Sequence, residues 1–189
     1  MDRFTALLDA NVIYPAGLRD TLLRLADRNL YRARWSAMIH KEWIRNVLND
    51  RPDLSPDQLE RTRETMDQHF PDALVVGFEP LIDGLSLPDP RDRHVLAAAI
   101  RGRVDLIVTQ NLKDFPQERL DPYEVEAQHP DDFALSLFDL YPGAVLGAVR
   151  DHRAALRRQP RTPEEHLQAY ERMGMTKFSS ALQAYTDVL

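Results

Sequence analysis

Short apolar runs alternate with amphipathic stretches along the first two thirds of this sequence, and this alternation restricts the fold more than any other feature. The run ARWSAMI at 33–39 is either a short strand or the start of the next helix. Three other runs are short, apolar and partly β-branched, which is typical of buried strands: one near 5–9, ALVVGF at 73–78 and VDLIVTQN at 104–111. Strands separated by helices favour a three-layer α/β fold with a mostly parallel sheet.

The stretches between these runs carry apolar residues at helical spacing. We expect helices over about 17–28, 36–50, 54–70 and 89–103. The third begins with Ser55, Pro56 and Gln58, which stand as N-cap, first-turn proline and N3 partner of a capping box. The fourth has Gly102 near its end, where helices commonly stop.

The pattern changes after about residue 130, where helical periods alone continue. Thr162, Pro163 and Glu165 repeat the capping signature, and Gly174 follows the helix that they start. We therefore divide the chain into an α/β domain at 1–128 and a helical C-terminal extension at 129–189.

Composition excludes several classes of protein. A chain of 189 residues with a net charge of −6 can bury a real core, but it lacks the basic surface of a protein that coats nucleic acid. The absence of cysteine excludes disulfides, thiolate metal sites and a cysteine nucleophile. We find neither a signal peptide nor a stretch near the roughly 20 apolar residues of a membrane span, so we expect a cytoplasmic protein.

A carboxylate, Asp9, stands inside the apolar run ALLDANVIYP at residues 6–15. A buried charge costs several kcal/mol unless a partner compensates it. The carboxyl ends of parallel strands gather functional groups at one edge of the sheet. Asn11 follows the first strand, and a second polar set follows the strand at 104–108: Thr109, Asn111 and Asp114. Two strand ends therefore each bring an acid and an amide.

Three further acids lie on predicted helices, and each has an ordinary structural interpretation. Asp89 precedes Pro90 and is a good N-cap, whereas Asp92 at N3 favours the helix dipole. Glu42 lies beside the apolar helix face of Ile39 and Trp43. Several converging carboxylates without a matching Lys or Arg in these motifs would repel one another. A hard divalent cation relieves that repulsion, and an all-oxygen set suits Mg²⁺ or Mn²⁺.

The ordered segments LLDANVIY, HKEWIRN, DPRDRHVLAAAI and LIVTQNLKDF resemble those of PIN domains, the nuclease domains of VapC-type toxins in bacterial toxin–antitoxin pairs. The resemblance covers about residues 1–125 and includes the T-x-N-x-x-D-F pattern. The extension resembles the C-terminal helical domain of a larger VapC-like subgroup.

The resemblance implies an Mg²⁺- or Mn²⁺-dependent endoribonuclease with an RNA substrate and a protein antitoxin. Asp89 then remains a helix cap, because Asp92 stands directly before HVLAAA, where the family has its acid. The family's acidic set corresponds to Asp9, Glu42, Asp92 and Asp114, with supporting polar residues Asn11, Thr109 and Asn111.

Other interpretations fit less well. A phosphatase of the haloacid-dehalogenase type needs a second Asp two residues after the first, and this chain has Asn11 there. A phosphoacceptor receiver domain needs a central strand-end Asp and a later Lys, and neither motif stands out. A catalytically inactive PIN fold that only binds a partner is the alternative, although all four acids are present.

One basic patch stands out in this acidic chain. The stretch 150–161 carries five arginines, of which Arg150, Arg153 and Arg157 would share one face if 150–157 is helical. We predict that this patch contacts RNA phosphates or an acidic antitoxin segment through Arg150, Arg153, Arg157 and Arg158. If these arginines are only a solvated face, the extension serves packing or a homodimer.

Overall fold

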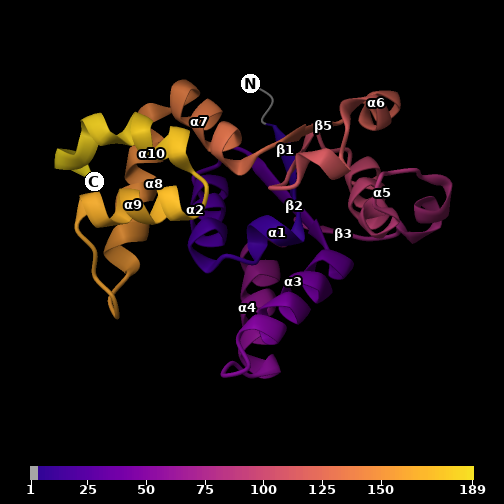
Figure 1. Cartoon of the computed structure of the whole chain (residues 1–189), viewed down its shortest axis with the longest axis horizontal. Helices are drawn as coiled ribbons and strands as arrows, with labels where there is room; N and C mark the ends of the chain where they lie inside the picture. Colours follow the sequence, from indigo (N-terminus) through magenta and orange to yellow (C-terminus); the bar gives the residue numbers. More distant parts are fainter. Residues whose placement is uncertain (1–3) are drawn as a thin grey trace.

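The computed structural model describes residues 4–189 and contains a five-stranded sheet (Figure 1). The strands lie in the order β3-β2-β1-β4-β5, and every neighbouring pair is parallel. Their bounds are β1 Thr5–Leu8, β2 Arg32–Ser36, β3 Leu74–Val75, β4 Leu106–Val108 and β5 Glu126–Gln128. The predicted parallel α/β class is confirmed.

Helices cover both faces of the sheet. The chain steps outward from β1 to β2 to β3 through α2, α3 and α4, and then reverses direction through α5 to reach β4. Right-handed crossovers place these two groups of helices on opposite faces, which gives three layers. The four helices are α2 Ala16–Asp27, α3 Ala37–Asp50, α4 Pro56–His69 and α5 Arg93–Arg101. Shorter turns complete the domain: α1 Ala10–Ile13, α6 Gln117–Leu120, and 3₁₀ segments at Glu79–Gly84, Pro90–Asp92, Leu112–Asp114 and Asp121–Tyr123.

Local sequence signals account for most of these boundaries. Ser55 and Gln58 form the predicted capping box at the start of α4, and Gly102 caps α5. The run at 33–39 resolves into both expected elements, because β2 ends at Ser36 and the Ser36 hydroxyl accepts the backbone N–H of Ile39 to start α3. Strand β5 was not predicted, because Glu126 and Gln128 lack the apolar character of the other strands.

The C-terminal extension is helical, as expected, and packs against the α/β domain through α8 and α2 (Figure 1). Thr162 and Glu165 form the second predicted capping box, and Gly174 adopts a positive φ of 81° after α9. Its elements are α7 Pro130–Leu140, α8 Pro142–Ala155, α9 Pro163–Arg172, α10 Thr176–Leu182 and a 3₁₀ segment at Gln183–Val188. Within residues 4–189, no helix combines the length and apolar character needed to cross a membrane.

The basic patch does not form the helix face that the spacing suggested. Helix α8 ends at Ala155, so Arg157 and Arg158 lie in the following turn. Arg153 is half-buried, and its guanidinium donates to the carbonyl oxygens of Leu189 and Arg161 at 2.9 Å each. Arg153 therefore ties the end of the chain to α8, whereas Arg150 and the turn arginines are exposed. A contact of these exposed arginines with RNA or an antitoxin stays a prediction.

Candidate active site

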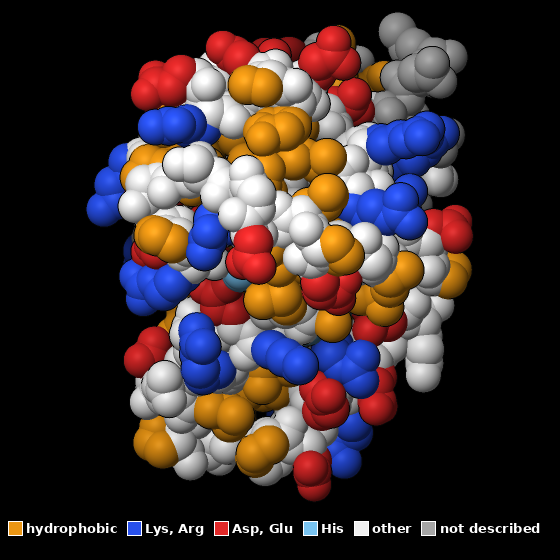
Figure 2. Space-filling view, turned by 90° about the vertical axis from the view of Figure 1, so that its right-hand side faces the viewer, with side chains coloured by type: hydrophobic (Ala, Val, Ile, Leu, Met, Phe, Trp, Pro, Cys, Tyr) orange, Lys and Arg blue, Asp and Glu red, His pale blue; other side chains and the backbone are white. Residues whose placement is uncertain are grey.

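The carboxyl ends of the parallel strands open into a cavity of about 640 Å³. Figure 2 shows acidic side chains recessed between Lys and Arg side chains near the middle of this face. The structure brings all four predicted acids to this cavity, from β1, α3, the start of α5 and the turn after β4. The lining comprises Asp9, Asn11, Met38, Lys41, Glu42, Arg45, Asn46, Asp89, Arg91, Asp92, His94, Asn111 and Asp114.

Asp9 is buried at the end of β1, with 5% of its surface exposed. One carboxylate oxygen accepts the backbone N–H of Ala10 at 2.7 Å. The other accepts the Asn11 amide at 2.7 Å and the Thr109 hydroxyl at 2.8 Å. Burial nevertheless outweighs these bonds and raises the pKa of Asp9 to about 6. The protein partners thus orient this carboxylate without fully compensating its charge.

A small polar network joins the two strand ends. The Asn11 amide also donates to the Thr109 hydroxyl oxygen at 2.9 Å, and its carbonyl oxygen accepts the backbone N–H of Gln110 at 3.0 Å. The same Thr109 oxygen accepts the backbone N–H of Asn111 at 3.1 Å. The predicted supporting role of Asn11 and Thr109 therefore has a structural basis, since both fix the position of Asp9.

Asp114 lies at the end of the 3₁₀ turn after β4 and lines the cavity. The Asn111 side-chain amide donates to its carboxylate. Asn111 therefore has the same relation to Asp114 as Asn11 has to Asp9. In each pair a side-chain amide donates a hydrogen bond to an acid that follows a strand. Each of the two strand-end loops supplies one acid together with its own amide, as the sequence predicted.

Asp92 and Asp89 differ in their contacts. The Asp89 carboxylate accepts the backbone N–H of Arg91 at 2.9 Å and pairs with the Arg91 guanidinium at 2.7 Å, so it is the predicted cap. Asp92 makes no capping hydrogen bond. Burial raises the pKa of Asp92 to about 7, and the raised value also reflects the negative charges of Asp9, Asp89, Asp114 and Glu42.

Glu42 projects from α3 into the cavity and meets a residue that sequence reasoning missed. The ring Nε2 of His94 lies 3.2 Å from the Glu42 carboxylate. His94 is buried, with 7% of its surface exposed, and its Nδ1 has no hydrogen-bond partner among the described residues. The sequence signal that could have identified His94 was its position two residues after Asp92, in the first turn of a predicted helix. The geometry identifies His94 as a residue that positions Glu42.

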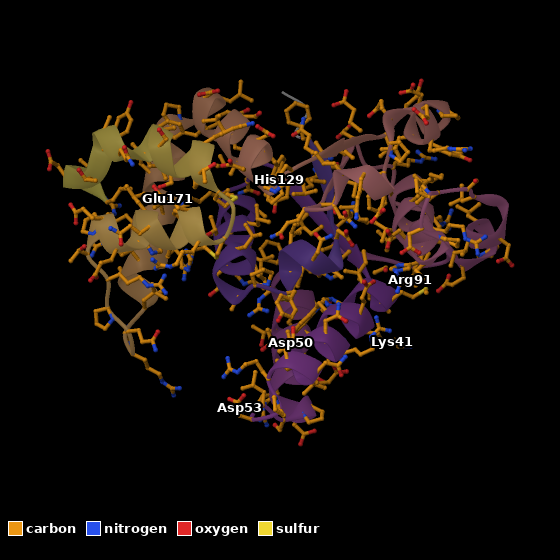
Figure 3. The ribbon with its side chains drawn as sticks, viewed as in Figure 1. Lys41, Asp50, Asp53, Arg91, His129 and Glu171 are labelled. Atoms are coloured by element: carbon orange, nitrogen blue, oxygen red, sulfur yellow. The ribbon has the colours of Figure 1, made fainter. Side chains whose placement is uncertain are left out.

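Positive side chains line the same cavity, which corrects the expectation of acids without a matching Lys or Arg. Lys41 and Arg45 are exposed on α3, four residues apart on one helix face. Arg91 lies next to Lys41 in Figure 3 and is also exposed. These cations belong to the rim, whereas Asp9 and Asp92 lie deeper and keep raised pKa values.

The oxygen-rich side chains that line the cavity are the kind of ligands that a hard divalent cation prefers. They include carboxylates and amides, and two of the acids carry charges that the surrounding protein leaves uncompensated. Within residues 4–189, no three His, Asp or Glu side chains already stand close enough to hold a metal ion.

The fold and the polar strand ends define a PIN domain. The family model described as "PIN domain" matches residues 5–113, more than half of the chain, so this chain belongs to that family. A second model, "VapC50 C-terminal domain", matches residues 130–184 and covers most of the helical extension.

One curated relative is a Mycobacterium tuberculosis (strain ATCC 25618 / H37Rv) protein with the name "Putative ribonuclease VapC50". It is 43% identical to this chain over 97 residues, which are 51% of this chain and 57% of the relative. The match therefore spans little more than half of the relative's length. No solved structure matches this chain.

Proposed function

We propose that this chain is an Mg²⁺- or Mn²⁺-dependent endoribonuclease of the VapC type. The observation that carries the proposal is the convergence of Asp9, Glu42, Asp92 and Asp114 on one cavity at the strand ends. Membership in the PIN family and the name of the mycobacterial relative support the same activity. A divalent ion bound there would lower the pKa of a water molecule and neutralise charge on the scissile phosphate.

The chain's own residues prepare this site. Thr109, Asn11 and the Ala10 N–H hold the Asp9 carboxylate in one orientation. Asn111 and His94 do the same for Asp114 and Glu42. Such outer contacts fix the ligand oxygens before a metal binds. Asp92, with its pKa of about 7, is the acid whose ionisation depends most on a bound cation.

The rim cations give this acidic site a way to hold RNA. A polyanion approaching four carboxylates meets repulsion, and the exposed Lys41 and Arg45 on α3 offset it at the entrance. We propose that RNA phosphates contact this rim. The exposed arginines of the extension, Arg150, Arg157 and Arg158, are the second candidate contact for RNA or an acidic antitoxin segment. A protein antitoxin, a homodimer and a cytoplasmic location belong to the same proposal.

The proposal predicts that Glu42→Gln weakens Mn²⁺ binding about tenfold or more and abolishes RNA cleavage, because it removes a ligand charge. Calorimetric titration of the metal-free chain with Mn²⁺, followed by cleavage of a labelled RNA pool with Mg²⁺ or EDTA, measures both effects. Glu79→Gln, an exposed acid outside the cavity, is the matched control. Unchanged Mn²⁺ affinity of Glu42→Gln would mean that Glu42 is not a ligand, and a wild-type chain that binds no Mn²⁺ would support the inactive PIN-fold alternative.

The two neighbouring acids should separate by mutation. We expect Asp92→Asn to lose RNA cleavage, whereas Asp89→Asn retains most of it because Asn caps a helix about as well as Asp. The comparison is well matched, since both changes remove one charge within four residues of sequence. Rate measurements at saturating Mg²⁺ check it. An inactive Asp89→Asn beside an active Asp92→Asn would reverse the assignment of the third acid.

A further inference from the structure

A second cavity, of about 680 Å³, lies beside the amino-terminal half of β2, away from the carboxyl ends that form the candidate active site. Strand β3 pairs with Trp35 and Ser36, so within residues 4–189 the outer edge of β2 before Trp35 has no neighbouring strand. The end of α2 and the loop after α4 border this edge. The lining comprises Ala26, Asn29, Tyr31, Arg32, Ala33, Arg34, His69, Phe70, Pro71, Asp72 and Ala73.

Two arginines of this cavity lack partners. Arg32 and Arg34 are alternate residues of β2 and therefore lie on one face of the strand. Neither guanidinium has a hydrogen bond or an ion pair within residues 4–189, and the Arg34 Nε is fully buried without a partner. Buried donors without partners are rare in folded proteins, and such a donor indicates an absent acceptor.

The strand edge adds a backbone donor to the same cavity. The N–H of Arg32 points to β1, where it donates to Phe4, and the N–H of Trp35 points the other way, to Ala73. Because N–H directions alternate along a strand, the N–H of Ala33 points to the open edge.

One acid, Asp72, also lines the cavity, and His69 pairs with Asp27 at 2.7 Å. The unpaired charges of the two arginines exceed that of Asp72.

We propose that this cavity binds the phosphate monoester of a nucleotide, either a free nucleotide or a phosphorylated RNA end. A phosphate monoester carries a charge of about −1.5 to −2 at pH 7, which matches two guanidinium groups. Its three terminal oxygens suit two arginine forks and a backbone N–H, whereas a carboxylate offers two. The half-buried Phe70, whose ring packs edge-to-face against His69 and Trp35, lines the cavity, and a cavity of about 300–1,000 Å³ suits a small ligand.

The free-nucleotide form of this proposal is independent of ribonuclease activity, and the RNA-end form rests on the proposed function. Binding is therefore measured in EDTA, where metal-dependent cleavage cannot occur. The full chain is titrated with AMP, GMP, the corresponding nucleosides, and a short RNA with and without a 5′-phosphate. We expect each phosphorylated probe that fits to bind at least tenfold more tightly than its unphosphorylated counterpart.

Mutations locate the binding. Arg34→Gln and Arg32→Gln should each weaken binding of the phosphorylated probe about tenfold, and Arg32 is exposed, so its variant should fold normally. Arg119→Gln on α6, an exposed arginine outside both cavities, should bind like the wild type. Binding of AMP or GMP assigns the free nucleotide, and binding of phosphorylated RNA alone assigns the RNA end. Equal binding of phosphorylated and unphosphorylated probes, unchanged affinity in both variants, or preference for a polyglutamate peptide would each overturn the proposal.

Discussion

Asp9→Asn should lower RNA cleavage by about 1,000-fold or more and, at the same time, stabilise the metal-free protein. The loss of activity follows from the proposed metal role, since a bound cation contributes several kcal/mol to the transition state and about 1.4 kcal/mol corresponds to a tenfold change in rate. Rates at saturating Mg²⁺ and an Mn²⁺ titration measure this part of the prediction.

The gain in stability follows from the raised pKa of Asp9. A shift from 3.8 to about 6 means that the ionised carboxylate costs the folded state about 3 kcal/mol at neutral pH. Asparagine removes that charge but loses part of the hydrogen bonding to Thr109 and Asn11. We expect a net gain of about 1–2 kcal/mol, which is about 2–8 °C in melting temperature for a chain of this length.

The two effects of this substitution have different controls. Asp83→Asn removes an exposed acid outside the cavity and should change neither activity nor melting temperature by a measurable amount. Excess Mg²⁺ should reverse the order of stability, because the metal stabilises only the wild-type site. Full Mg²⁺-dependent cleavage by Asp9→Asn would refute the metal role, and a lower metal-free melting temperature would refute the uncompensated charge.

Most of the fold was predictable because local signals agreed with the tertiary structure. The strand at Thr5–Leu8 and the capping box at Ser55 lie where the sequence places them. Strand β5 was missed, because its pairing with β4 comes from backbone hydrogen bonds that its polar residues Glu126 and Gln128 do not announce. The sequence left open whether 150–157 is helical; α8 ends at Ala155, and Arg153 near its end donates to the carbonyl oxygens of Leu189 and Arg161.

The candidate site, like the fold, was predictable only in part. Sequence order locates acids at strand ends, because parallel strands bring their carboxyl ends to one edge. It does not locate groups whose position depends on how one helix packs against another. His94 contacts Glu42 although the two residues are 52 positions apart in the sequence. Lys41 lines the rim because the packing of α3 turns this side of the helix toward the cavity. The sequence predicted that Asp89 is the helix cap, and its hydrogen bond from the Arg91 N–H confirms this.

A buried histidine pair lies between the extension and the α/β domain. The rings of His152 on α8 and His166 on α9 are 4.8 Å apart, and 2% and 1% of their surfaces are exposed. His152 Nδ1 lies 3.0 Å from the Thr21 hydroxyl of α2, whereas neither ring nitrogen of His166 has a partner among the residues that the structure describes. Burial lowers the pKa of His152 to about 4 and that of His166 to about 3, and nearby cations act in the same direction: Arg24, Arg153 and Arg161.

These shifts make the histidines destabilising in acid. Both pKa values are lower in the folded state than the ordinary 6.5, so the unfolded chain binds protons first as the pH falls below 6.5. Between pH 7 and pH 5 each histidine should remove about 2 kcal/mol from the free energy of unfolding. Asp9 has the opposite effect in the metal-free protein: because its pKa is raised, the free energy of unfolding gains about 1 kcal/mol as the pH falls from 7 to 5. Asp92, whose charge is partly screened by solvent, contributes in the same direction.

His166→Leu should therefore stabilise the chain and change its response to acid. Leucine has nearly the same volume and leaves no buried ring nitrogen without a partner, so we expect a gain of about 1–2 kcal/mol at pH 7. At pH 5 the gain should increase by about 2 kcal/mol, because the variant no longer loses stability through this histidine. Urea unfolding at both pH values measures the difference, and His69→Gln, at an exposed histidine, is the control. An equal gain at both pH values would mean that His166 titrates normally in the folded protein, and a loss at pH 7 would mean that its ring has a partner.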